Sequence, residues 1–420
     1  MFLEAYRMKL RPKSGFFVEM REGVHMAASI ICKGFRMAGI SAGLKKEGKP
    51  DLGLLVCDAP AAVAGVFTTN RVQAAPVRLT RGRIGSGRCQ AVIVNSKNAN
   101  CCTGAQGATD AAAMAEVAAR ALGIAVELVA VASTGVIGEP LPLSKITAAV
   151  PELAGALSEE GLEAFAGSIM TTDTVPKTAA TTVSLEHGSF SVVGVAKGAG
   201  MIRPDMATLL SFVWTDAAAA PEVLASILQP AVDATFNRIS IDGDTSTNDT
   251  VLLLAGGASG VSASSGPGRD ALAEAVQKVL SDLARAIVKD GEGATKLVEI
   301  RVRGADSDQS AREIADTVAH SNLVKTAFFG QDANWGRILA AAGRAGVAFD
   351  PETVDLYFDN VRMVRNGVGC GKDAEAAATA VLKQPEFTVT LDLNGGRGEA
   401  AVLTCDFSVD YVRINADYRS

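Results

Sequence analysis

The sequence predicts an α+β protein in which helices and sheets pack in layers. Short apolar runs bounded by Gly, Pro, Asp and Asn are typical of strands with close connections. Longer alanine- and leucine-rich stretches are typical of helices. These helices are mixed with antiparallel hairpins, and no repeat of fixed period occurs. The mixture favours α+β layers over a doubly wound parallel sheet.

The composition is that of an ordered globular protein with a large core. The 420 residues are 48% hydrophobic and include 42 glycines, which is enough chain for two or three domains. The net charge is −6 with no block of basic residues, so we expect no nucleic-acid partner. No stretch approaches the ~18–20 uninterrupted apolar residues of a membrane-spanning helix, so we expect no membrane partner.

The cysteines and histidines disfavour several kinds of site. The seven cysteines form no C-x-x-C pair and have no histidine at ligand spacing, so we expect neither a disulfide framework nor a metal. We interpret them as small buried residues of a protein in the reducing cytosol. The histidines, none in a nucleophile-like context, are His25, His187 and His320. A hydrolase that depends on histidine is therefore disfavoured.

The first half of the chain predicts a strand-rich segment, then helices and a hairpin. Residues 1–25 have neither a clear period nor a secretory pattern, so we expect a disordered extension, with Met26 as an alternative start. Four strands are expected at 52–58, 61–70, 75–81 and 89–95. They are followed by a polar loop at 95–107, a helix at Asp110–Leu122 that begins at its Asp, a strand that ends before Thr134-Gly135, helices at 143–157 and 159–170, and a hairpin at 181–198.

The second half predicts a long helix and a β-rich end. A Gly/Ser/Pro-rich surface loop at 259–270 is a plausible domain boundary marker. The elements expected here are a helix at 221–240 broken at Pro230, a turn at 241–250 leading into a strand, helices at 271–289 and 311–329, a strand at 296–304 between them, a turn into a helix at 329–346, and strands at 354–359, 361–367, 386–393, 399–408 and 409–415.

Several motifs have a plain structural interpretation. The clusters KGAGMI and NGVGCGK fit neither GxxxxGK[ST] nor a GxGxxG between strand and helix, so turn-forming glycine is favoured over a nucleotide site. The acidic segment IDGDTSTNDT lacks the ligand spacing of a calcium loop, and we interpret it as a hydrogen-bonded turn that shapes a cleft. Asp332 or Asn334 is expected to cap a helix. Glu292, between two glycines, is by default an exposed-loop residue.

The stretch from Lys197 to Trp214 holds the candidate for the chemistry. Gly198 and Gly200 permit unusual backbone angles, and the apolar run after Thr208 predicts a buried strand. The local pattern alone favours an ordinary loop-to-strand junction. A threonine freed at a new N-terminus, however, has its own α-amine as base, with a pKa of ~7.7–8.0. This source of a base is attractive in a chain with so few histidines.

Taken together, the motifs resemble one family, the ornithine acetyltransferases of arginine biosynthesis (bifunctional glutamate N-acetyltransferases, the ArgJ family). The resemblance covers residues 34–420. It is carried by GFRMAGISAGLK, STGVIG, MTTDTVPK, KGAGMIRPDMATLL, DGDTSTNDT, DGEGATK, SNLVKTAFFGQDANWGR and YVRINADYRS. Jointly these segments are far more specific than any one of them.

The resemblance implies a precursor that cuts itself between Ala207 and Thr208. The products would be an α chain ending at 207, with its organised part from 26, and a β chain, 208–420, and two such pairs would form a heterotetramer in the cytoplasm. Thr208 would be the nucleophile. It would take acetyl from N2-acetyl-L-ornithine, form an acetyl-enzyme and pass the acetyl group to L-glutamate. Acetyl-CoA is a further donor in the family, although no CoA site is identifiable; we expect no cofactor.

The resemblance also assigns residues by position. Thr134 and Gly135 match the oxyanion hole, although a strand-ending turn is the simpler interpretation of that segment alone. The substrate-binding positions are matched by Thr171, Lys197, Thr208, Glu292, Asn415 and Ser420. Thr172 is an alternative to Thr171. Lys197 can meet a substrate carboxylate and Glu292 the ornithine ammonium.

The implied fold is a layered αββα sandwich of the self-cleaving N-terminal-nucleophile kind, with helices outside two β-layers. Residues 26–207 and 208–280 would form the sandwich, and 281–420 a smaller C-terminal α+β part whose tail returns to the active site. Arg203 and Asp205 depart from the family pattern, which puts the cleavage rate in question. Two rivals stay open: a related self-processing amidase or aminopeptidase that uses water as acceptor, and a non-catalytic glycine-rich binding protein.

Overall fold

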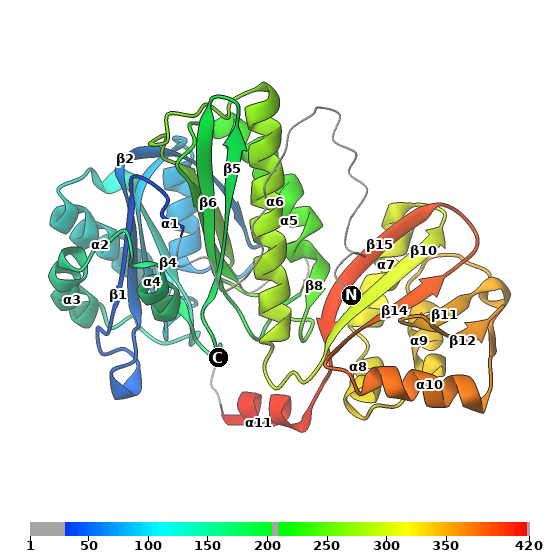
Figure 1. Ribbon diagram of the computed structural model, residues 1–420. Coiled ribbons are helices and arrows are strands. Elements are labelled where there is room, and N and C mark those ends of the chain that lie inside the picture. Colours follow the sequence, from blue (N-terminus) through cyan, green and yellow to red (C-terminus); the bar gives the residue numbers. More distant parts are fainter. Residues whose placement is uncertain (1–29, 204–208, 418–420) are drawn as a thin grey trace.

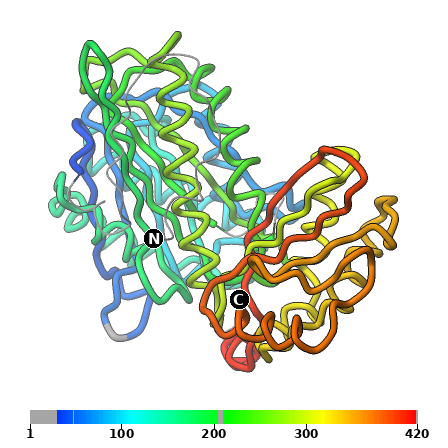
Figure 2. Tube along the Cα trace, turned by 45° about the vertical axis from the view of Figure 1, so that its right-hand side comes forward, coloured from blue at the N-terminus to red at the C-terminus, as the bar shows by residue number. Residues whose placement is uncertain are grey.

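The computed structural model describes residues 30–203 and 209–417, which form a larger and a smaller body (Figures 1 and 2). Each body has its own β-sheet and its own helices. The predicted α+β class is confirmed. The predicted extension at 1–25 lies outside the described residues. Within the described part of the chain, no helix is both long and apolar enough to cross a bilayer.

The larger body is built on an eight-stranded sheet. The order of its strands is β4-β3-β2-β9-β7-β6-β5, and β1 pairs with β2 outside this path. The pairs β3–β4 and β7–β9 are parallel, and the other pairs are antiparallel. The strands are Phe35–Ile40 (β1), Leu52–Phe67 (β2), Arg88–Asn95 (β3), Val129–Ser133 (β4), Lys177–Leu185 (β5), Gly188–Lys197 (β6), Leu210–Thr215 (β7) and Thr250–Ala255 (β9).

The long strand β2 belongs to both halves of this sheet. Its first part pairs with β1 and β3, its last part pairs with β9, and the register shifts between Val56 and Ala61. Pro60 lies in this irregular stretch, as expected for a residue that cannot donate a ladder hydrogen bond. The two strands predicted at 52–58 and 61–70 are therefore one strand, because the chain passes through the irregularity without turning back.

The two halves of the sheet enclose an inner apolar layer. Side chains from both halves meet there, including Phe35 and Leu55 on one side and Phe212 and Trp214 on the other, with Phe165 of helix α4 (Leu162–Ile169) among them. Strand β7 is buried on both faces, because all six of its residues are buried.

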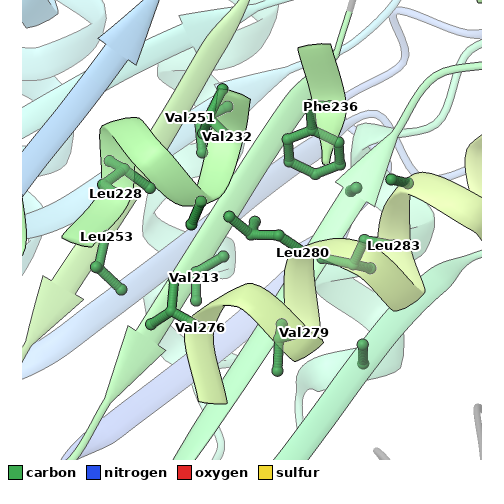
Figure 3. Close-up of a cluster of buried hydrophobic side chains, with 14 of the residues drawn as sticks. Val213, Leu228, Val232, Phe236, Val251, Leu253, Val276, Val279, Leu280 and Leu283 are labelled. Atoms are coloured by element: carbon green, nitrogen blue, oxygen red, sulfur yellow. The ribbon is translucent and has the colours of Figure 1, made fainter. Parts of the chain in front are cut away.

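Helices cover both outer faces of the sheet. Helices α2 (Gly104–Leu122) and α3 (Leu143–Gly155) pack on the half with β1 to β4. Helices α5 (Pro221–Ala234) and α6 (Gly266–Lys289) pack on the half with β5, β6, β7 and β9. Figure 3 shows Leu228 of α5 and Leu280 of α6 packed against the strand side chains Val213 and Leu253. This order of layers confirms the predicted αββα sandwich.

The smaller body has a seven-stranded sheet in the order β13-β12-β11-β14-β10-β15-β8. Its strand β8 (Ile239–Ser240) comes from the segment after α5 and pairs with β15, so the two bodies share a backbone ladder. The other strands are Leu297–Ala305 (β10), Asp355–Phe358 (β11), Val361–Arg365 (β12), Val368–Gly369 (β13), Glu386–Asp392 (β14) and Gly398–Cys405 (β15). Its helices are Asp308–Ala319 (α7), Asn322–Phe329 (α8), Trp335–Ala342 (α9) and Lys372–Leu382 (α10).

The division predicted after residue 280 falls inside α6. This helix continues to Lys289, and its buried residues as far as Val288 belong to the core of the larger body. Apart from strand β8, the smaller body therefore begins with β10. The helical periodicity of the apolar residues in α6 extends past residue 280, because the helix face that packs on the sheet continues beyond it.

Three predicted elements up to and including helix α5 are corrected. Residues 75–81, predicted as a strand, form helix α1 (Ala75–Ile84), which has a proline in its first turn. Helix α2 begins at Gly104, so Asp110 lies within it and accepts a hydrogen bond from the Gln106 amide (2.7 Å) rather than starting the helix. Helix α5 continues through Pro230 instead of breaking there.

The chain after α5 also differs in three places. The helix predicted at 311–329 is two helices, α7 and α8, with Ser321 between them. Helix α10 was not predicted. Residues 409–415, predicted as a strand, lie in helix α11 (Val409–Asp417) because their alternating pattern has no neighbouring strand to pair with. Asn334 caps α9 by accepting a hydrogen bond from the Arg337 N–H (3.1 Å).

Candidate active site

A cleft in the larger body gathers most of the predicted site residues. It encloses about 540 Å³ of empty space, part of it open to solvent. Its lining comes from the end of β4, the segment before β5, the end of β6, the turn before β9, the turn after α6, and α11. The predicted residues on this lining are Thr134, Gly135, Thr171, Lys197, Glu292 and Asn415. Ala207, Thr208 and Ser420 lie outside the described residues.

The turn after β4 is held in an unusual conformation. The Thr134 N–H donates to the Asn95 carbonyl at 3.0 Å. Gly135 has φ +130°, and a Cβ at this position would lie 2.2 Å from the carbonyl carbon of Lys97. Only glycine fits this conformation and this close approach. Thr134 and Gly135 therefore form a rigid strand-ending turn, and the same turn is the one that the resemblance matches to an oxyanion hole.

The turn 246–249 supports both the Gly135 turn and the start of β7. The Asn248 amide donates to the carbonyls of Ser133 and Ala99, each at 2.7 Å. Asp249 accepts a hydrogen bond from the Leu209 N–H at 2.9 Å. Burial raises the pKa of the Asp249 carboxyl well above its usual range, which favours the neutral form. The prediction that IDGDTSTNDT shapes a cleft agrees with this geometry, since Ser246, Thr247 and Asn248 line the cleft.

Lys197 supplies a buried cation to the cleft. It is the last residue of β6 and is 3% exposed. Its Nζ donates to Thr134 Oγ1 at 3.2 Å. Burial lowers the pKa of Lys197, and the negative charge of Asp173 opposes this shift. A buried ammonium that faces an open cleft is suited to a carboxylate ligand, which would supply the missing opposite charge.

Glu292 supplies a carboxylate to the same cleft. Its N–H donates to the Ala199 carbonyl at 2.7 Å, and its Oε2 accepts from the Asn415 amide at 2.7 Å. Glycine is required at position 200, because a Cβ there would lie 2.4–2.6 Å from the Glu292 carboxylate atoms. Glu292 is 9% exposed, so the expectation of an ordinary exposed-loop residue is wrong. The pattern of the sequence does not reveal that α11 covers this loop.

Helix α11 is fastened beside the cleft by several contacts. The Ser408 hydroxyl donates to the Gly293 carbonyl at 2.6 Å, and the Tyr411 hydroxyl donates to Asp242 at 3.3 Å. The rings of Phe407 and Tyr411 lie 4.3 Å apart. These contacts place Asn415 on the lining of the cleft.

Thr171 and Thr172 both line the cleft. The Thr171 N–H donates to Asp173 Oδ2 at 2.9 Å, which fixes the backbone of this wall. Since both threonines reach the lining, the choice of Thr171 over Thr172 stays a prediction.

The comparison with known proteins identifies the family. Residues 36–420 match the sequence model described as the ArgJ family. The chain belongs to the ArgJ family. It is 52% identical over 390 residues to the arginine biosynthesis bifunctional protein ArgJ of Geobacter sulfurreducens, covering 92% of this chain and 99% of that protein. The corresponding protein of Symbiobacterium thermophilum is 51% identical over 392 residues, covering 92% of this chain and 97% of that protein.

Two solved structures match parts of the chain. A Bacillus halodurans ArgJ chain is 41% identical, with a TM-score of 0.47, and the match covers 49% of this chain and 98% of that one. An ornithine acetyltransferase from Mycobacterium tuberculosis, crystallised with ornithine, is 42% identical, with a TM-score of 0.41, and the match covers 45% of this chain and 98% of that one.

Some residues of this ArgJ cleft were not singled out from the sequence. Ile137 and Met201 line it, and Asp173 and Asp249 lie behind it. The motifs MTTDTVPK, KGAGMIRPDMATLL and DGDTSTNDT contain most of them, so segments that carry the resemblance reach the cleft or its support. A signal for the individual side chains is absent, because their importance comes from contacts between segments far apart in the chain.

Proposed function

We propose that the chain is an acyltransferase of arginine biosynthesis that moves an acetyl group from N2-acetyl-L-ornithine to L-glutamate. The observation that carries the proposal is the cleft in which a buried Lys197 ammonium and the Glu292 carboxylate line one space beside the Thr134-Gly135 turn. An amino-acid substrate has both opposite charges, so such a pair can orient it. The relatives at about half identity are named for arginine biosynthesis, which supports the same substrate class.

The proposed reaction begins with self-cleavage between Ala207 and Thr208. The freed α-amine of Thr208 takes the proton from its own hydroxyl, and the oxygen attacks the acetyl carbonyl of N2-acetylornithine. The Gly135 N–H, assisted by the Thr134 hydroxyl, stabilises the oxyanion. The amine returns its proton to the departing ornithine nitrogen, which leaves an acetyl ester on Thr208.

The second half of the cycle reverses these steps with a new acceptor. The glutamate amine attacks the ester, its proton passes to the Thr208 α-amine and then to the departing threonine oxygen, and N-acetylglutamate leaves. Lys197 holds the substrate carboxylate and Glu292 the side-chain ammonium of ornithine. Acetyl-CoA would enter the same cycle as an alternative acetyl donor and not as a bound cofactor.

The remaining assignments concern contacts and assembly. Thr171, Asn415 and Ser420 complete the substrate contacts. The two chains produced by the cut stay together, and two such pairs form a heterotetramer in the cytoplasm.

The proposal is tested on one preparation by intact mass, a denaturing gel and transfer kinetics. Wild-type protein is expected to give two chains, with the β chain beginning at Thr208. Without glutamate it should release at most one ornithine per active site from N-acetylornithine, and continuous release of ornithine should require glutamate. Thr208→Ala is expected to give one uncut, inactive chain. Cleavage that persists at this bond in T208A would refute the assigned nucleophile. Acetate formed equally fast without glutamate would show an amidase instead.

A further inference from the structure

A row of buried charges lies behind the cleft, outside the residues used in the proposed reaction. Lys177 Nζ lies between two carboxylates, 2.7 Å from Asp173 Oδ1 and 2.6 Å from Asp290 Oδ2. The side chains of Lys177 and Asp173 are 1% and 0% exposed, and that of Asp290 is 8% exposed. Burying three charges is unfavourable unless each is paired and hydrogen-bonded, as these are. Asp173 is the member that is hydrogen-bonded to the wall of the cleft.

The Asp173 carboxylate holds two parts of the cleft wall. Its Oδ1 accepts a hydrogen bond from the Gly198 N–H at 2.7 Å, and Gly198 directly follows Lys197. Its Oδ2 accepts from the Thr171 N–H at 2.9 Å. One carboxylate therefore fixes the backbone next to Lys197 and the wall formed by Thr171 and Thr172.

The same carboxylate balances the charge of Lys197. Among the described residues, the Lys197 ammonium has no carboxylate within ion-pair distance, and its hydrogen bond goes to the neutral hydroxyl of Thr134. Burial lowers the pKa of Lys197, and the negative charge of Asp173 is the strongest effect that raises this pKa again. The other charges that act on Lys197 are Lys177 and Lys45, which repel it, and Asp249 and Glu292, which attract it.

The two other acids are less able to fill this role. Burial raises the pKa of Asp249 and so favours its neutral form. Glu292 is hydrogen-bonded to Asn415. Burial by itself would raise the pKa of Asp173 too, but Lys177 and Lys197 hold that pKa well below its usual range, so Asp173 stays ionised.

We propose that Asp173 is a positioning residue, which keeps Lys197 cationic for the substrate carboxylate and fixes the Thr171–Thr172 wall of the cleft. Lys177 pairs with Asp173, and Asp290 pairs with Lys177 without contacting Asp173. Asp290 is itself fixed by the backbone N–H of Thr174 at 3.0 Å. The effect of Asp173 on substrate binding rests on the proposed function, in which Lys197 binds that carboxylate.

The main experiment compares Asp173→Asn with the matched control Asp290→Asn. Both substitutions remove a carboxylate from Lys177, but only Asp173 contacts Thr171 and Gly198. In wild type, KM for N-acetylornithine is expected to rise with pH as Lys197 loses its proton. In D173N this rise begins at least about one pH unit lower, and KM at neutral pH is at least about tenfold higher, while kcat changes less than about threefold. D290N is expected to match wild type both in KM at neutral pH and in the pH at which KM begins to rise.

A readout without activity separates this inference from the proposed function. In lysine-labelled protein, the NMR signal of the Lys197 side chain, assigned with Lys197→Arg, reports its protonation directly. D173N is expected to lower the pH midpoint of the Lys197 titration, and D290N is expected to leave this midpoint unchanged. An unchanged midpoint in D173N, or an equal shift in both variants, overturns the inference. Wild-type protein that transfers no acetyl overturns the proposed function alone.

A double variant guards against loss of folding. Asp173→Asn alone leaves Lys177 with one partner, whereas Asp173→Asn with Lys177→Met removes both charges of the buried pair, which is tolerated better. If D173N does not fold, the KM and NMR measurements are made on this double variant. A higher KM for N-acetylornithine or a lowered Lys197 midpoint supports the role of Asp173. Wild-type values of both refute it.

Discussion

Gly200→Ala is expected to damage substrate binding without destabilising the protein. The added methyl group would lie 2.4 Å from Glu292 Oε2, 2.5 Å from Cδ and 2.6 Å from Oε1. Ordinary carbon–oxygen contact requires roughly 3.4 Å or more, so the carboxylate has to move back by about 1 Å. Its hydrogen bond to the Asn415 amide, now 2.7 Å, would then be broken. Stability changes by less than about 1 kcal/mol, because the atoms that must move are the end of a flexible side chain.

The loss appears in the binding of ornithine-type substrates. The proposed contact between the displaced Glu292 carboxylate and the ornithine ammonium is a hydrogen bond between charged groups. Such a bond contributes about 1.5–3 kcal/mol, and each 1.4 kcal/mol is a factor of ten. We therefore expect KM for N-acetylornithine to rise about 10- to 100-fold in steady-state transfer assays, with self-cleavage unaffected on a gel. Gly167→Ala in α4 is the control, because its Cβ would meet no atom within 4 Å. A wild-type KM in G200A would refute the assigned placement of Glu292.

Three further outcomes follow from the structure. Asn415→Ala is expected to raise KM for N-acetylornithine about fivefold, since it removes one partly exposed hydrogen bond to Glu292. Gly135→Ala is expected to lower the free energy of unfolding by at least about 2 kcal/mol in denaturant titrations and to slow transfer, because the methyl group would meet the Lys97 backbone. Burial lowers the pKa of His320 from 6.5 to about 4, so the folded state binds its proton less readily and stability falls as pH drops from 6.5 to 4, by at most about 3 kcal/mol. His320→Gln is expected to flatten this dependence in thermal melts taken across that range, and an unchanged slope would contradict it.

The elements that were predicted well are those whose pattern is local. The run from Leu210 to Thr215 is apolar throughout and is a strand buried on both faces. The segment 75–81 misled because its apolar residues alternate like those of a strand, while α1 gains its stability by packing beside β4, where Thr80 Oγ1 donates to the Val131 carbonyl at 2.7 Å. Pro230 was read as a helix breaker, yet tertiary packing of α5 outweighs that local preference.

The site could be predicted only to the level of its segments. The resemblance named Thr134, Lys197 and Glu292, and the fold brings them to one cleft. The pairing of Lys177 with Asp290 joins residues 113 positions apart, and no spacing in the sequence reveals it. Individual supporting side chains therefore needed the tertiary structure, because a buried charge is explained by its partner and not by its neighbours in the chain.

The interleaving of the strands has a consequence for how a cut protein could be assembled. Strands β7 and β9, which follow the proposed cut, lie between β2 and β6, which precede it. The two chains would be woven into one sheet, so neither could leave without breaking ladders on both sides of the inserted pair. Unfolding would then separate the chains, and refolding would become an encounter of two molecules whose rate depends on concentration, whereas the uncut precursor folds alone. The order of events, folding first and cutting afterwards, would thus be built into the sheet.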